Sequence, residues 1–432
     1  MPGTQNNRLY FCADLGTSSL KAALIDNTGR LHGFARVPFN NECADTWLSA
    51  FLEAAEKLAS KKIIPPDKGT VMEPVSAIVI SGSGPTLVPV KGSDPVSSES
   101  LRPVYWYDPV PLAADSSYNS SSFFLPKLKA FIETQPEIFA GVQYFFSPEE
   151  WLSWKLGARP VTVLPHNAYI PYYWDDEVCG RFGIKRDVFP PFVVMGSTIG
   201  ELNYASLTKE SSVLAKKNST LAKLLPPGIP IIAGASDFIM AIIGTGTLDT
   251  GTICDRTGSS EGINLCVSSP PEHSLADRKS GELRILPHAL PGLWNLGVVI
   301  RKSGKLFDEF RIENGLESKS YNELVREILG DISHKGRPVL ESIGSSFVKA
   351  LNTVENLGYS VTELVLSGGQ CADPLWNQYK ADLSERILKV PEIIHAELAG
   401  NAVLCEAAFS GKSIRETATA MIRIKETYRP GK

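Results

Sequence analysis

The 432-residue sequence lacks the features that mark several classes of protein. Its seven cysteines are an odd number and form no C-x-x-C pair, so we expect buried free thiols rather than a disulfide framework or a cysteine metal cage. No run approaches the roughly 20 apolar residues of a membrane span, and the polar residues 1–8 lead directly into a strand pattern. We therefore expect neither a membrane span nor an apolar leader, and we place the protein in the cytoplasm.

The sequence also has no excess of basic residues. Lys and Arg number 43 against 47 Asp and Glu, which gives a net charge of −4 at pH 7. Because nucleic-acid-binding domains usually carry a basic patch, neither a nucleic acid nor a polyanionic acceptor is an expected partner. The rest of the composition, 43% hydrophobic and 21% charged, is typical of a globular protein. Since 432 residues exceed one ordinary core, we expect two domains of about 200 residues each.

The first informative stretch covers residues 9–30. An apolar run ends at Asp14, small residues follow at 16–19, and a second run alternates before a turn at 27–29. This pattern predicts a β-hairpin bent around a polar loop. The loop is not a Walker loop, because it leads into a strand and lacks the G-x-x-x-x-G-K signature.

The loop of this hairpin contains the residue types that hold a phosphate. Gly16 allows a ligand to approach the backbone, and Thr17 and Ser18 offer hydroxyl and amide groups. Lys21 adds a cation just behind the loop, and Asp14 would face the metal ion that a phosphate brings. The alternative interpretation is an ordinary hairpin turn that is rich in small residues.

A second loop, residues 81–86, follows a buried strand at 77–80. It contains Ser83 and Gly84, and its glycines let the backbone approach a ligand. A simple tight connection between two strands would use the same residues.

A third segment, residues 103–108, reads as a strand that ends in an aromatic platform beside a carboxylate. The aromatic face of Trp106 suits the C–H groups of a polyol, and the carboxylate of Asp108 can accept two hydroxyl hydrogen bonds. Alternatively, Trp106 belongs to the core and Asp108 is a turn residue before Pro109.

Asp237 lies at a junction between a buried strand, residues 229–233, and an apolar helix. At this place it is an accessible carboxylate, and it can equally be a helix N-cap with no further role. Another helix, residues 338–356, carries an apolar stripe that we assign to the core (Leu340, Ile343, Phe347, Leu351 and Val354).

Two stretches in the second half of the sequence again show a strand that ends in a turn of small residues. Residues 251–267 read as strand, small-residue turn and strand, with Gly258 and Ser259 in the turn. A mere hairpin is again the alternative. Farther on, a strand at 363–366 ends in Ser-Gly-Gly-Gln, residues 367–370, before a helix, and such a junction lets a nucleotide approach the backbone closely.

The string D-L-G-T-S-S at Asp14 resembles the first phosphate motif of the sugar-kinase, Hsp70 and actin superfold, in which two related domains close over ATP. The later strings, above all S-G-G-Q followed by P-L-W-N-Q, narrow the resemblance to the FGGY family of carbohydrate kinases. The resemblance implies an α/β protein of two ribonuclease H-like domains, residues 1–246 and 247–432, with a central ATP cleft.

The resemblance also implies roles for single residues. Asp237 would be the catalytic base, and Asp14 would face Mg²⁺. ATP and its phosphates would be bound by Gly16, Thr17, Ser18, Lys21, Gly258, Ser259, Gly368, Gly369 and Gln370. The sugar would be bound by Ser83, Gly84, Trp106, Asp108 and Asp237.

The sequence departs from the family pattern at three places. Val110 stands where many relatives have an arginine, and Gly84-Pro85 replaces the Met-His of xylulose kinases. A long insertion usual before the helix at 338 is missing between Ile300 and Gly336, which implies a shortened C-terminal domain.

The expected function is ATP-dependent phosphorylation of a hydroxyl of a small sugar, ketose or polyol, with ATP and Mg²⁺ as cofactors. Asp237 would take the hydroxyl proton, while Mg-ATP is held between the two phosphate loops. The alternative is a catalytically weak or inactive nucleotide- or sugar-binding protein on the same fold. The expected partner is the small sugar or polyol, with a homodimer left open, and no nucleic acid or membrane.

Overall fold

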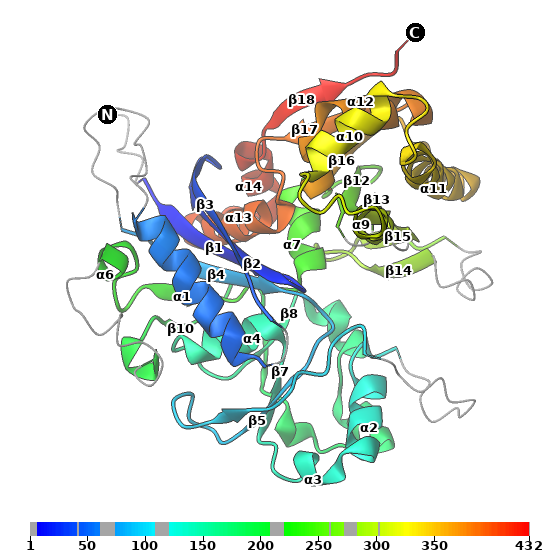
Figure 1. Ribbon diagram of the computed structural model, residues 1–432. Coiled ribbons are helices and arrows are strands. Elements are labelled where there is room, and N and C mark those ends of the chain that lie inside the picture. The colour runs from blue at the N-terminus through cyan, green and yellow to red at the C-terminus, as the bar shows by residue number, and fades with distance from the viewer. Residues whose placement is uncertain are drawn as a thin grey trace. The chain divides into compact units, whose positions relative to one another are not determined.

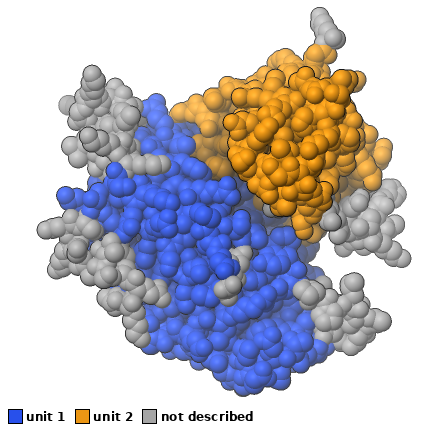
Figure 2. Space-filling view, in the orientation of Figure 1, with its two compact units in different colours: residues 1–240, 397–421 blue, residues 241–396, 422–432 orange. Residues whose placement is uncertain are grey.

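The computed structural model describes residues 7–40, 43–60, 74–108, 121–207, 220–258, 261–271, 283–300 and 303–431. The chain forms two compact units (Figure 2). The first comprises residues 1–240 and 397–421, and the second comprises residues 241–396 and 422–432. The compact units divide after Met240, and residues 397–421 belong to the first unit because they pack along its central strand. The division into domains at residues 246 and 247 stays a prediction.

The first unit is built on a six-stranded sheet in the order β10-β11-β4-β1-β2-β3 (Figure 1). Its strands are β1 (Leu9–Leu15), β2 (Ser19–Asp26), β3 (Leu31–Pro38), β4 (Ala77–Gly82), β10 (Thr198–Glu201) and β11 (Pro230–Ile232). Two small sheets contain β5 (Val88–Lys91), β6 (Glu99–Ser100) and β7 (Tyr144–Phe146), and β8 (Thr162–Leu164) and β9 (Phe192–Val194).

The helices of this unit are α1 (Asp45–Ser60), α2 (Leu125–Thr134), α3 (Pro136–Phe139), α4 (Pro148–Lys155), α5 (Asp176–Phe182), α6 (Thr220–Leu224), α13 (Ala396–Ser410) and α14 (Ile414–Met421), with 3₁₀ helices η2 (Asn167–Tyr172), η3 (Arg186–Val188) and η4 (Tyr204–Leu207). Helix α7 (Asp237–Gly244) begins in the first unit and continues into the second.

Helices cover both faces of β1, which explains why every residue of this strand is buried. Successive side chains of a strand point to opposite faces of the sheet. Accordingly, Phe11 contacts Phe51 of α1, whereas the hydroxyl of Tyr10 donates to Glu406 of α13 at 2.5 Å. The core of the unit therefore lies in two layers, one on each side of the sheet.

The second unit is built on a seven-stranded sheet in the order β14-β15-β13-β12-β16-β17-β18. Its strands are β12 (Ile253–Thr257), β13 (Glu261–Val267), β14 (Leu283–Pro287), β15 (Trp294–Ile300), β16 (Glu363–Gly368), β17 (Ile387–Pro391) and β18 (Ile424–Tyr428). Its helices are α9 (Ser303–Glu313), α10 (Tyr321–Gly330), α11 (Arg337–Asn356) and α12 (Pro374–Ser384), with 3₁₀ helix η6 (Gly369–Ala372). The predicted stripe of α11 is confirmed as core, since all five of its residues are buried.

The two sheets share a five-strand core. The order β3-β2-β1-β4-β11 in the first matches β15-β13-β12-β16-β17 in the second. In both, the first two neighbouring pairs are antiparallel and the next two are parallel. The α/β class and the predicted internal duplication are therefore confirmed. Among the described residues, no helix is long and apolar enough to cross a membrane.

Candidate functional site

Asp14 lies near the carboxyl end of β1 and is held from two sides. Its Oδ2 is 3.0 Å from Nζ of Lys21, directly opposite it on β2, and its Oδ1 accepts a hydrogen bond of 3.0 Å from Ser81 Oγ on β4. The carboxyl side chain is only 2% exposed. Burial raises the pKa of Asp14 above its usual range, and the charge of Lys21 opposes this shift. The hairpin and the Lys21 cation predicted around Asp14 are thus present in the structure.

Helix α13 completes the surroundings of Asp14 with residues that the sequence analysis missed. Asn401 donates to the Ala13 carbonyl at 2.9 Å and to Ser81 Oγ at 3.1 Å. Glu397, one helical turn earlier, interacts electrostatically with Asp14, whose pKa it raises further, and with Lys21. No local pattern marks these two residues, because they lie almost 400 positions from β1 in the sequence.

The predicted phosphate loop joins β1 to β2 as a short turn. Its backbone is closed by a hydrogen bond of 3.1 Å from Gly16 N to Ser19 O, and Thr17 and Ser18 are exposed. The loop therefore presents backbone amides and hydroxyls at the surface, next to Lys21, as a phosphate-binding turn requires.

Asp237 is the first residue of α7 and is half-buried. Its Oδ1 accepts a hydrogen bond of 2.6 Å from the backbone of Phe238, and its charge raises the pKa of Lys21. The segment before it pairs with the end of β4 through a parallel bridge between Gly82 and Ser236. Asp237 therefore lies at the same end of the sheet as Asp14 and the loop at 81–86.

The structure brings the two predicted sugar segments together. A bridge pairs Leu87 with Val104, and the backbone of Trp106 donates to Thr86 Oγ1 at 3.3 Å. Ser83 is buried and Gly84 is half-buried in the first segment. Trp106 is 44% exposed, so the alternative that it belongs to the core is wrong.

Asp108 is less open to a ligand than we predicted. Its two oxygens pair with the guanidinium of Arg102 at 2.8 and 2.9 Å, and Oδ2 also accepts from Tyr105 N at 2.9 Å. Burial alone would raise the pKa of Asp108, but these hydrogen bonds lower it below its usual range. Each carboxylate oxygen accepts about two hydrogen bonds, so the Arg102 pair leaves little capacity for a second acceptor role.

Lys127 binds the backbone of the same segment. Its ammonium donates to the carbonyls of Tyr105, at 3.0 Å, and of Trp106. Burial lowers the pKa of Lys127 to about 8. The backbone that carries the aromatic platform is therefore held by a cation and by the Arg102–Asp108 pair.

Two buried glutamates lie at the start of α4, against the end of β4. Glu150 accepts hydrogen bonds from Ser147 N at 2.8 Å and Val163 N at 2.6 Å. Glu149 Oε2 has no hydrogen-bond partner among the described residues and lies so close to Gly82 that an added Cβ there would be 2.4 Å from it. Burial, together with the charge of Glu150, raises the pKa of Glu149 to about 8.

In the second unit the structure joins two predicted nucleotide segments. Strands β12 and β16 are parallel neighbours in which Thr257 pairs with Gly368, and Thr257 Oγ1 donates to Ser367 O at 2.6 Å. Gly258 follows β12 directly, and Gly369 and Gln370 open η6. The carboxyl ends of β12 and β16 therefore lie side by side. Ser259 lies outside the described residues.

Position 368 requires glycine for two reasons. Its φ is +94°, which favours glycine, and a Cβ there would lie 1.9 Å from the carbonyl oxygen of Thr257. Because no side chain fits at position 368, this residue contributes only backbone atoms to the turn.

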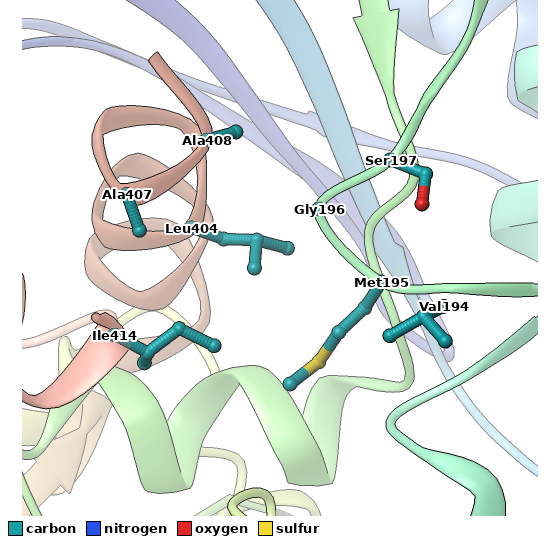
Figure 3. Close-up of a pocket in the computed structure, with 8 residues that line it drawn as sticks. All are labelled: Val194, Met195, Gly196, Ser197, Leu404, Ala407, Ala408 and Ile414. Carbon is teal, nitrogen blue, oxygen red and sulfur yellow. The ribbon is translucent and has the colours of Figure 1, made fainter. Parts of the chain in front are cut away.

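A pocket elsewhere in the first unit contains none of these residues (Figure 3). Its lining combines the segment between β9 and β10 with α13 and the start of α14: Val194, Met195, Gly196, Ser197, Leu404, Ala407, Ala408 and Ile414. Met195 and Ile414 point toward each other across it, Leu404 points toward Gly196, and Ser197 carries the one polar side chain of the lining. Without charged groups, this pocket offers no phosphoryl or sugar chemistry.

Comparisons with known proteins agree with this arrangement. Residues 278–409 match the model of the FGGY family of carbohydrate kinases, C-terminal domain. The chain is 23% identical to xylulose kinase of Bacillus subtilis (strain 168), over 96% of this chain and 92% of that protein. It is 27% identical to L-fuculokinase of Salmonella typhi, over 58% of this chain and 56% of that protein.

Solved structures support the fold. The crystal structure of gluconate kinase from Lactobacillus acidophilus aligns with a TM-score of 0.77 at 16% identity and covers 99% of this chain and 94% of that one. The alignment with the Bacillus xylulose kinase spans 494 positions, more than this chain has, so that relative carries segments without a counterpart here. The two-domain fold of the sugar-kinase, Hsp70 and actin superfold is thereby confirmed, and the match at residues 278–409 and the similarity to sugar kinases agree with the resemblance to the FGGY family of carbohydrate kinases.

Proposed function

We propose that this chain transfers the γ-phosphoryl group of ATP to a hydroxyl of a small sugar, ketose or polyol. The observation that carries the proposal is the Asp14–Lys21 pair at 3.0 Å beside the turn at residues 16–18, where Thr17 and Ser18 are exposed. The bridge between Gly82 and Ser236 places Asp237 at the same end of the sheet as this pair. Phosphoryl transfer needs mainly positioning and neutralisation of charge, which such an arrangement supplies.

Asp237 would accept the proton of the attacking hydroxyl. It is half-buried at the start of α7, beside the loop that carries Ser83 and Gly84, so a sugar bound on that loop would lie within its reach. An ordinary carboxylate suffices for this role when the proton moves late, after the hydroxyl has become acidic.

Mg²⁺ fits this proposal as an ion that arrives with the nucleotide. No group of three His, Cys, Asp or Glu side chains that could hold a metal occurs in the part of the chain that the structure describes. Asp14 supplies one buried carboxylate, and Glu397 places a second negative charge near it. When bound, Mg²⁺ would neutralise charge on the phosphates, and Asp14 would hold it through water.

The second unit would contribute the turn after β12 and the turn after β16. Gly368 lies directly beside Thr257, the last residue of β12. We propose that Gly258 and Ser259 bind phosphate, while Gly368, Gly369 and Gln370 bind the rest of the nucleotide. Mg-ATP would then be held by one hairpin from each unit.

The substrate class follows from the sugar segments and the relatives together. The names of the similar proteins include xylulose, gluconate and L-fuculose-type kinases, all of which act on small polyhydroxylated molecules. The exposed face of Trp106 suits the C–H side of such a molecule. Because Arg102 occupies much of Asp108, we expect hydroxyl recognition to come mainly from the loop at 81–86 and from Asp237.

The deciding experiment measures ADP release by the purified protein against a panel of pentuloses, hexuloses, polyols and sugar acids. We expect one class to stimulate ADP release well above the rate without acceptor. The second candidate is a binding protein without turnover on the same fold. Saturable nucleotide and sugar binding without ADP release against any acceptor would establish that second function instead.

A further inference from the structure

A buried ion cluster ties together the predicted nucleotide segments of the second unit. Nζ of Lys380, on α12, lies 2.6 Å from Oδ2 of Asp255 on β12 and 2.6 Å from Oε1 of Glu261 on β13. The three side chains are at most 1% exposed. The ammonium also lies 3.8 Å from the ring centroid of Phe347 on α11, which closes the cluster from the other side.

The charges of this cluster balance only if it retains one proton. Two carboxylates and one ammonium would otherwise leave a net negative charge in a buried site, which is costly. Burial and the neighbouring Glu261 raise the pKa of Asp255 well above its usual range, although Lys380 opposes the shift. Lys380 lies equally close to both carboxyl groups, and a proton retained between them would balance the charges of the cluster.

The cluster lies where β12 ends and β13 begins. Asp255 is two residues from the end of β12, and Glu261 is the first residue of β13, paired with Thr257. Lys380 therefore clamps both strands of the hairpin, at Asp255 of β12 and at Glu261 of β13.

The same cluster reaches the turn after β16. Glu261 Oε2 accepts a hydrogen bond of 2.7 Å from Ser303 Oγ, which in turn lies 3.5 Å from Nε2 of Gln370. Helix α12, which carries Lys380, begins one residue after η6 and is capped by Asp373. The hairpin, the Gly-Gly-Gln turn and α12 are thus joined through one network of side chains.

We propose that Lys380 is a positioning residue for nucleotide binding, which fixes the β12–β13 turn against the turn after β16 without touching the nucleotide itself. The inference rests on the proposed function, because it assigns ATP contacts to these two turns. In this proposal the buried Lys380 affects ATP affinity through the hairpin, without contact with ATP.

The test uses a charge-balanced variant, since removing Lys380 alone would leave a buried carboxylate without its cation. The double variant Lys380→Met/Glu261→Gln removes one positive and one negative charge and replaces them with neutral groups of similar size. We expect the Kd for a nonhydrolysable ATP analogue with Mg²⁺ to rise about tenfold to a hundredfold, because small misplacements of a binding turn cost that much. The KM for the sugar should stay within about twofold.

One double variant serves as the matched control. Lys389→Met/Glu363→Gln removes a 2.6 Å ion pair between β16 and β17 of the same sheet, on its exposed side, and should leave the Kd unchanged. Normal binding by Lys380→Met/Glu261→Gln, or equally weak binding by the control, would overturn the proposal.

Hydrogen exchange separates this inference from the proposed function. In the protein without nucleotide, Lys380→Met/Glu261→Gln should speed amide exchange at residues 255–263 and leave β14 and β15 unchanged. Unchanged exchange at the hairpin would refute the positioning role even if the kinase activity is confirmed. A wild-type protein that binds the analogue but releases no ADP would refute only the proposed function, since the Kd comparison still decides the role of Lys380.

Discussion

Asp237 combines two roles that a single substitution can separate. As a helix-start residue it accepts a hydrogen bond from Phe238 N, which the isosteric amide of Asn also accepts. As a base it must take a proton, which an amide does not do. We expect Asp237→Asn to lower kcat by about three orders of magnitude while ATP affinity changes only a few fold. Steady-state kinetics and analogue binding on the same preparation test this, and near-normal turnover would rule out Asp237 as the base.

Asp14 has a different expected signature, because it acts on the metal–phosphate side. Its replacement removes the partner of Lys21 and the acceptor of Ser81. We expect Asp14→Ala to lower kcat about a hundredfold and to raise the Mg²⁺ concentration needed for half-maximal rate, while sugar binding persists. Kinetics at varied Mg²⁺, with sugar affinity measured by calorimetry, provide the test. A collapse of sugar affinity instead would assign Asp14 to the acceptor side.

Among whole elements, the junction of β16 with η6 depends on backbone packing. Gly368 has φ +94°, and a Cβ there would overlap the Thr257 carbonyl at 1.9 Å. Gly369 has open space around the same position. We expect Gly368→Ala to lower the free energy of unfolding by about 1–3 kcal/mol and to weaken nucleotide binding, whereas Gly369→Ala has little effect on stability. Urea denaturation of both variants measures the difference, and equal stability would show that β12 moves aside at no cost.

The packing of α4 on β4 makes stability depend on pH. The pKa of Glu149 rises from its ordinary value near 4.5 to about 8 in the folded state. The folded protein thus holds a proton that the unfolded chain has lost, so this contribution is complete below about pH 4.5 and disappears as pH rises through 8. We expect Glu149→Gln to be more stable than wild type at pH 8 by at least about 1 kcal/mol, since each pKa unit is worth about 1.4 kcal/mol.

Urea unfolding of wild type and Glu149→Gln at pH 5.5 and pH 8 measures how the free energy of unfolding of each protein changes with pH. Glu137→Gln, at an exposed position, serves as the matched control and should follow the wild-type slope. An identical pH dependence in wild type and Glu149→Gln would mean that Glu149 is ionised in the folded protein.

At the scale of the whole molecule, the proposed reaction draws on both units. Asp237 and the sugar segments belong to the first unit, while Gly258 and Gly368 belong to the second. Transfer requires the two sets of ligands to meet, and a closed site would exclude water as a competing acceptor. The chain passes from one unit to the other at residues 240–241, 396–397 and 421–422, so we expect the hinge at these three crossings.

Solution scattering tests this closure. We expect the true sugar together with a nonhydrolysable ATP analogue to reduce the radius of gyration, and either ligand alone to reduce it less. Calorimetry under the same conditions confirms that both sites are filled. An unchanged scattering profile with both ligands bound would contradict a closing mechanism.

The sequence by itself determined the local architecture of this protein. The hairpin around Asp14, its counterpart at 251–267 and the strand that leads to Asp237 all follow from apolar runs broken by small polar turns. Strand alternation and turn chemistry act between neighbours in the chain, so a pattern in the sequence expresses them directly. The motif strings express the resemblance to the FGGY family for the same reason.

The tertiary structure alone decided which distant side chains complete each site. Glu397 and Asn401 join Asp14 from a helix that we had assigned to the other domain, and Arg102 occupies the carboxylate of Asp108. Helical periodicity specifies only which face is apolar, not which strand will cover it. The choice of partner comes from the close packing of the whole unit, where shape and charge are matched across hundreds of residues of sequence.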